Sequence, residues 1–80
     1  PQAAAVGTRY VQAGMFGVHG NAQAAVRRLS SMGVPARMSR VTQGGKTYTL
    51  VLAGPYGSEQ ELRTGLQRTR QAGFSDAFPR

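Results

Sequence analysis

The 80-residue chain contains no cysteine and no tryptophan, and it has one histidine and three acidic residues. Without cysteine it can form neither disulfides nor thiolate metal sites. The histidine, His19, and the acids, Glu59, Glu61 and Asp76, make no pair of catalytic carboxylates, no serine–histidine–aspartate set and no metal-ligand cluster. We therefore expect no catalysis, no cofactor and no metal site in this segment.

Long apolar runs are also missing, because no stretch approaches the roughly 18 apolar residues of a membrane-spanning helix. Direct membrane insertion of this segment is therefore not expected. Eighty residues are enough for one small domain. The opening stretch PQAAAVGT is rich in small residues, proline and glutamine, so residues 1–8 are interpreted as a linker remnant and residues 9–80 as the domain.

Negative charge is scarce. Ten lysine and arginine residues stand against three acids, which gives a net charge of +7 at pH 7, and nine of the ten cations are arginine. The planar guanidinium suits carboxylates and phosphates, so this balance predicts an anionic partner such as nucleic acid, an acidic membrane surface or an acidic polysaccharide. Solubility alone also accounts for a charge of this size, so arginines on solvated helix faces remain an alternative.

One short phrase occurs twice. VQAGMFG begins at Val11 and VLAGPYG begins at Val51, 40 positions later, and the glycines and the aromatic residue match at that offset. We interpret each phrase as a strand-to-helix corner in which glycine turns the chain and the aromatic residue packs under the helix. Two such units joined by a hairpin predict an α+β, ferredoxin-like or RNP-like βαββαβ fold, with a four-stranded antiparallel sheet and two helices on one face.

Capping signals predict where the two helices begin and end. Asn21 is the expected N-cap of the first helix, and Ser58 with Glu61 forms a capping box for the second. Gly33 and Gly73 are the expected stops.

The signals between the helices predict a hairpin. Pro35 lacks an amide donor, so the second strand, around residues 34–41, should lie at an edge or begin just after it. Gly44 and Gly45 predict the turn into the third strand, TYTLVLA, which we expect to end at Gly54.

Strand alternation predicts which side chains the helices leave uncovered. The small residues of the first and third strands share the helix face: Val11, Ala13, Val51 and Ala53. The open face then carries Tyr10, Gln12, Tyr48, Leu50 and Leu52. An apolar patch in the open usually marks a binding surface, and the alternative is that a dimer partner or a neighbouring domain covers it.

From about residue 9 to residue 80 the chain resembles the SPOR domain, the sporulation-related repeat of bacterial cell-wall proteins. The resemblance rests on YVQAGMF, NAQAAVRRLSSMGVPARM, YTLVLAGPY and QAGFSDAF. It implies non-catalytic binding of peptidoglycan glycan strands on the open sheet face, with a preference for denuded strands that have lost their stem peptides. It also implies that the domain targets a parent protein, such as a lytic transglycosylase or amidase, to the division septum in the periplasm of a Gram-negative bacterium.

The resemblance also implies which positions bind the glycan. Gln12 matches a ligand-facing glutamine, Asn21 matches a polar binding position, and Met15 stands where the family commonly has serine. Leu50 and Leu52 stand in a strand where the family often has arginine. The full set of expected contact residues is Tyr10, Gln12, Met15, Asn21, Tyr48, Leu50, Leu52 and Phe78. An arginine near the groove, Arg37 or Arg40, is expected to pair with the lactyl carboxylate of a stripped strand.

Two other functions remain open. RNA-recognition domains share the predicted topology, but the strand TYTLVLAG has one aromatic residue and no cation, so no nucleic-acid partner is expected. The second alternative is a protein-interaction or dimerisation module that uses the open sheet face. Against that alternative, we expect a monomer.

Overall fold

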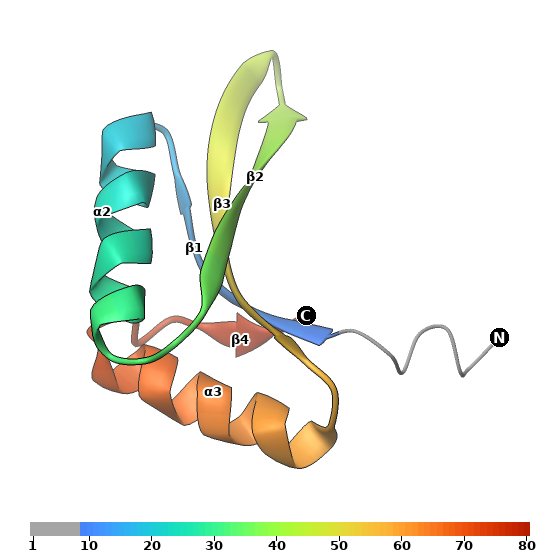
Figure 1. The fold of residues 1–80 in the computed structure, drawn as a ribbon. Coiled ribbons are helices and arrows are strands. Elements are labelled where there is room, and N and C mark those ends of the chain that lie inside the picture. Colours follow the sequence, from blue (N-terminus) through green and yellow to red (C-terminus); the bar gives the residue numbers. More distant parts are fainter. Residues whose placement is uncertain (1–8) are drawn as a thin grey trace, which may run out of the picture.

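The computed structural model describes residues 9–80. Its elements are β1 (Arg9–Phe16), α2 (His19–Ser31), β2 (Ala36–Gln43), β3 (Lys46–Tyr56), α3 (Glu59–Gln71) and β4 (Phe78–Pro79). The strands form one antiparallel sheet in the order β2-β3-β1-β4, with both helices against one face (Figure 1). This confirms the predicted α+β fold. The predicted linker lies outside the described residues, and no helix within 9–80 is long and apolar enough to span a membrane.

The repeated phrases form the central strand pair of the sheet. Gln12 and Leu52, which are equivalent positions of the two halves, lie directly opposite each other. The next pair joins Gly14 to Val51, so Ala13 is an extra residue on β1 with no partner on β3. Such an insertion is a β-bulge, which bends the strand and reverses the alternation of side chains beyond it.

A second register shift occurs at the other end of the same pair. Val11 lies opposite Ala53 and Arg9 lies opposite Tyr56, so β3 carries one more residue than β1 over this interval. The extra residue falls within the Gly54–Pro55 segment, where Gly54 has a φ of 126°.

The predicted end of the third strand at Gly54 is therefore wrong, because β3 continues to Tyr56. Gly14 and Gly54 lie inside the strands, which continue to Phe16 and Tyr56 before the chain leaves the sheet. The physical reason is that these glycines accommodate register shifts within the sheet, and an alternation count that ignores such insertions places the end of the third strand too early.

Both aromatic residues reach the helix side because of these shifts. Phe16 lies opposite Thr49 and packs against the core, and Tyr56 packs against the core in the same way. Without the extra residue, Met15 instead of Phe16 would point toward the helices. The predicted packing of the aromatic residue of each phrase under the helices is thus confirmed, but a register shift within the strand, and not a turn at the glycine, directs the ring there.

The core lies between the helix face of the sheet and the two helices. It consists mainly of small and branched apolar residues: Val11, Ala13, Ala22, Ala25, Leu29, Val34, Val51, Ala53, Leu62, Ala72 and Ala77. The alanines let the helices approach the sheet closely, and the two aromatic rings fill the remaining volume.

The first helix begins differently from the prediction. Val18, in extended conformation, is the N-cap, and no side chain caps this end. The Val18 carbonyl accepts a hydrogen bond from the Asn21 amide at 3.0 Å, so Asn21 already lies within the first helical turn. Asn21 is consequently a first-turn residue of α2, and its predicted capping role is wrong. His19 is the first residue of this helix.

The second helix begins as predicted. The Glu61 amide donates to Ser58 Oγ at 3.1 Å, and the Glu61 carboxylate accepts from the Gly57 amide at 3.1 Å. Both helices stop where expected, because Gly33 and Gly73 have φ angles of 78° and 108°, which favour glycine.

The hairpin also follows the prediction. β2 begins at Ala36, directly after Pro35, and lies at the edge of the sheet. Gly44 and Gly45, with φ angles of 57° and 80°, connect β2 to β3.

The contact between Tyr56 and Gly65 gives a stability test. The Tyr56 ring lies directly over Gly65 of α3, and a Cβ added at Gly65 would stand 2.7 Å from Cε2 of that ring. We expect Gly65→Ala to lower the free energy of unfolding by about 1–3 kcal/mol because the ring has to move. Gly20→Ala in α2, where nothing lies within 4 Å, is the matched control and should be neutral or stabilising. Urea unfolding measures both, and equal stability of the two variants would contradict the packing.

Candidate functional site

The open face of the sheet carries a shallow groove of about 410 Å³. Its lining comes from all four strands and the residue after β4: Gln12, Met15, Val41, Gln43, Leu50, Phe78 and Arg80. Four of the residues expected from the sequence therefore come together here, namely Gln12, Met15, Leu50 and Phe78.

Apolar side chains form the floor and walls of this groove. Leu50 is only 4% exposed although no helix covers it, because its neighbours on the open face enclose it. Met15 and Phe78 are 44% and 47% exposed, so they offer accessible apolar surface on β1 and β4. The bulge at Ala13 is what places Met15 here, opposite Leu50. This combination suits a ligand that has apolar faces as well as polar groups.

Gln12 and Arg80 form the polar part of the groove. The Arg80 guanidinium donates to Gln12 Oε1 at 2.8 Å, and the Arg80 backbone amide donates to the Tyr10 carbonyl at 2.8 Å. Together these bonds fix the end of the described chain beside β1. They also orient the Gln12 amide, so that its Nε2 group is the donor available to a ligand.

Three further expected residues lie on the open face beside the groove. Leu52 is between Gln12 and Arg37 in the sheet register. The guanidinium carbon of Arg37 stands 5.7 Å from the centroid of the Tyr10 ring, within cation–π distance. Tyr48 is half-buried on the same face, opposite Val41. These residues extend the open surface along the strands.

Two sequence-based expectations do not fit this surface. Asn21 lies in α2, on the helix side of the sheet, and does not line the groove. Arg40 lies opposite Thr49, which shares the helix face with Phe16, so of the two arginines considered only Arg37 lies on the open face.

Arg80, Val41 and Gln43 are groove residues that sequence reasoning missed. Alternation along residues 36–43 would have indicated Val41 and Gln43, which share the face of Arg37, once β2 is paired with β3. Arg80 has no such signal, because its position depends on how the short β4 strand docks against β1.

The charge around the groove is positive. None of its lining residues is acidic, whereas Arg80 lies in it and Arg37 lies beside it. Two of the three acids, Glu59 and Glu61, lie in the first turn of α3, where Glu59 forms an exposed ion pair with Arg63 at 3.3 Å. The groove therefore attracts an anionic group.

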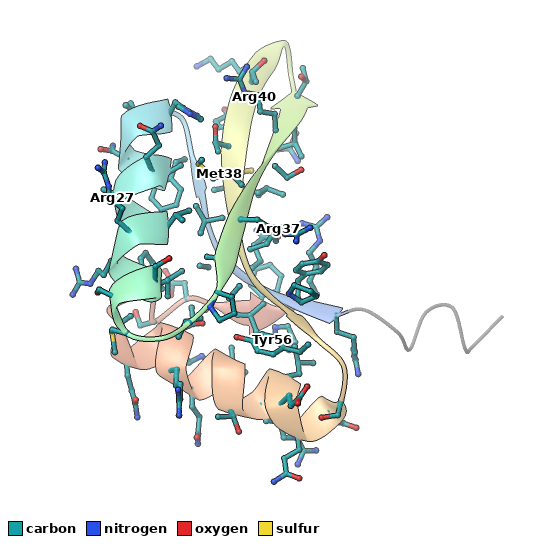
Figure 2. All side chains as sticks on the ribbon, in the orientation of Figure 1. Arg27, Arg37, Met38, Arg40 and Tyr56 are labelled. Carbon is teal, nitrogen blue, oxygen red and sulfur yellow. The ribbon has the colours of Figure 1, made fainter. Side chains whose placement is uncertain are left out.

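A second cavity, of about 630 Å³, lies along α3 on the other side of the molecule. Its walls are Pro55, Tyr56, Ser58, Gln60, Glu61, Thr64, Gly65 and Arg68. The Glu61 carboxylate is engaged by the Gly57 amide, and the Tyr56 ring packs on Gly65 between the sheet and α3 (Figure 2). This cavity thus belongs to the packing of α3 on the sheet.

Catalytic and metal-binding arrangements are absent from the part of the chain that the structure describes. No group of three or more histidine, cysteine, aspartate or glutamate side chains gathers there. His19 Nδ1 lies 3.4 Å from Thr49 Oγ1, and no acidic side chain contacts the ring within residues 9–80.

The sequence and the fold of the chain are similar to those of known proteins. The SPOR domain family model matches residues 5–80. The SPOR domain of RlpA from Pseudomonas aeruginosa superposes with a TM-score of 0.81 at 25% identity, over 90% of this chain and 96% of that one. The peptidoglycan binding domain of the Bacillus subtilis cell wall lytic enzyme CwlC gives a TM-score of 0.72 at 27% identity, over 92% and 87% of the two chains. No curated protein sequence matches the chain.

The environment of Tyr56 predicts a loss of stability in alkaline solution. Burial raises the pKa of the Tyr56 hydroxyl above its ordinary value of 10.0, and the positive charge of Arg68 opposes this shift. The folded state holds this proton more tightly than the unfolded state does. The protonated Tyr56 hydroxyl therefore contributes fully to the free energy of unfolding below about pH 10, and this contribution is lost as the pH rises through the higher folded pKa. Tyr56→Phe should therefore lose less stability than the native protein as the pH rises from about 9 through the folded-state pKa of Tyr56.

Urea unfolding at a series of pH values measures this difference. Parallel pH profiles for the native protein and Tyr56→Phe would contradict the buried position of the hydroxyl.

Proposed function

The chain belongs to the SPOR domain family, and on that premise we propose that it binds peptidoglycan through the open face of its sheet, without catalysis. The observation that carries this proposal is the groove in which Gln12, Met15, Leu50 and Phe78 meet. Support also comes from the structural similarity to a domain described as peptidoglycan binding.

The groove has the chemistry that a glycan strand requires. Sugar rings present apolar C–H faces, which can pack on the exposed surfaces of Met15 and Phe78. Their hydroxyl and acetamido groups need donors and acceptors, which Gln12 and Gln43 supply from opposite sides of the groove. Tyr10, Tyr48 and Leu52 extend the apolar contact surface along the strands, whereas Asn21 would have to contact the glycan from the start of α2.

Denuded strands are the proposed preferred form. Removing a stem peptide from a muramic acid residue leaves a lactyl carboxylate, and Arg80 lies in the groove to pair with it. Arg37 provides a second positive charge on the same face. Stem peptides would add bulk close to this surface, so the intact polymer would be disfavoured by steric clash as well as by the lost charge pair.

Binding of this kind would serve to place a larger protein. We infer that the domain, residues 9–80 behind a linker at residues 1–8, acts as a monomer in the cell envelope. In this proposal it directs a parent protein, such as a lytic transglycosylase or amidase, to denuded strands at the division septum in the Gram-negative periplasm. Nucleic acid plays no part in this proposal.

Sedimentation with purified sacculi tests the ligand. The isolated domain should pellet with sacculi treated with an amidase, which removes stem peptides, and much less with untreated sacculi, because only the former expose the carboxylates. Equal pelleting with both would refute the preference for denuded strands, and pelleting with neither would refute peptidoglycan binding.

A variant pair tests the groove in the same assay. Gln12→Ala should weaken binding about 3- to 10-fold, the effect of losing one hydrogen-bonding side chain. Gln67→Ala, an exposed glutamine on α3, removes the same group away from the groove and should bind like the native domain. Equal binding by both variants would exclude Gln12 from the site.

A further inference from the structure

The edge strand β2 leaves part of its backbone without a partner. Within residues 9–80 it pairs only with β3. The Gly54 amide donates to the Pro35 carbonyl at 2.9 Å, which makes Ala36 and Ala53 a non-hydrogen-bonded pair. Hydrogen-bonded and non-hydrogen-bonded pairs alternate, so the amides and carbonyls of Met38 and Arg40 point away from β3 into open space.

A notch lies directly beside this free edge. It has a volume of about 260 Å³ and is lined by Gln23, Val26 and Arg27 of α2 and by Met38 of β2. Val26 is half-buried and Met38 is 38% exposed, so the notch has an apolar floor. Figure 2 shows Met38 on the side of β2 that faces α2. The notch has room for one aliphatic side chain next to the unpaired backbone.

Arginines flank the edge on both sides. Arg40 shares the helix side with Met38, and Arg27 borders the notch from α2. Arg37 lies on the opposite side of β2, as Figure 2 shows. Neither α2 nor β2 contains an acidic residue, so no partner on these two elements neutralises the three guanidinium groups.

This charge decides which strand can add to the edge. A second copy of the chain, pairing β2 against β2, would line the arginines of both copies along one strand pair with no acidic residue of β2 to neutralise them, and such like-charge placement is how edge strands resist self-association. An extended segment with carboxylates at the same places would gain the backbone hydrogen bonds and the charge pairing together.

We propose that the β2 edge binds an extended acidic peptide of a partner protein, which adds to the sheet as a fifth strand. An aliphatic side chain of this peptide occupies the notch beside Met38, and the residues two positions before and after it are acidic and face Arg27 and Arg40. The site is distinct from the groove on the open face and does not depend on the ligand of that groove.

Hydrogen exchange followed by NMR tests the proposal with a defined probe. The probe is a capped heptapeptide with a central leucine, threonines on either side of it and glutamates beyond them, and serine at both ends. On adding it to the domain, exchange of the Met38 and Arg40 amides should slow about tenfold or more, because these amides gain partners. The Ser39 and Val41 amides, already bonded to β3, should change little.

Peptide and protein controls separate this binding from general charge attraction. A peptide with lysine in place of glutamate should bind at least about tenfold more weakly in fluorescence anisotropy. Arg40→Glu should weaken binding of the acidic peptide about tenfold or more, whereas Arg63→Glu, the same change at an exposed site on α3, should have little effect. Met38→Pro removes one outward amide without breaking a β2–β3 hydrogen bond and should also weaken binding.

The proposal fails if the Met38 and Arg40 amides stay unprotected at saturating acidic peptide. It also fails if Arg40→Glu and Arg63→Glu reduce binding equally, since that result indicates non-specific charge attraction. Dimerisation of the isolated domain through β2, seen by light scattering and removed by Met38→Pro, would assign the edge to a second copy instead.

Discussion

The arrangement of this domain depends on one constraint in its central strand pair. β1 carries an extra residue at Ala13 and β3 carries one near Gly54, and both strands continue beyond these points. Each insertion reverses the alternation of side chains, which sends Phe16 and Tyr56 into the core. The same reversal sends Met15 to the open face, so packing of the core and composition of the groove are set together.

Much of the fold could be predicted from local chemistry. Gly33 and Gly73 end the helices at positive φ, Ser58 caps α3, and Pro35 precedes an edge strand, all as their residue types require. These features depend on near neighbours in the chain. The bulges do not, because an extra residue can be recognised only when the two strands are paired, and an alternation count ignores pairing.

The groove residues placed by strand alternation could likewise be predicted from the sequence, whereas the one placed by a contact between distant segments could not. Gln12 and Leu50 belong to the regular part of the alternation, and their placement on the open face follows from it. Arg80 entered the groove through the docking of the short strand β4, which is fixed in part by Arg70, whose guanidinium donates to the Ala77 carbonyl at 3.0 Å and 3.2 Å. A contact between distant segments of this kind leaves no local pattern in the sequence.

We propose that the groove around Gln12 and Leu50 holds a glycan strand. The most direct measurement is an NMR titration of the domain with denuded oligosaccharides released from amidase-treated peptidoglycan. We expect saturable shift changes at the backbone amides of Gln12, Met15, Leu50 and Phe78, with the amides of α3 unaffected. Changes confined to the α3 cavity, or none at saturating oligosaccharide, would contradict it.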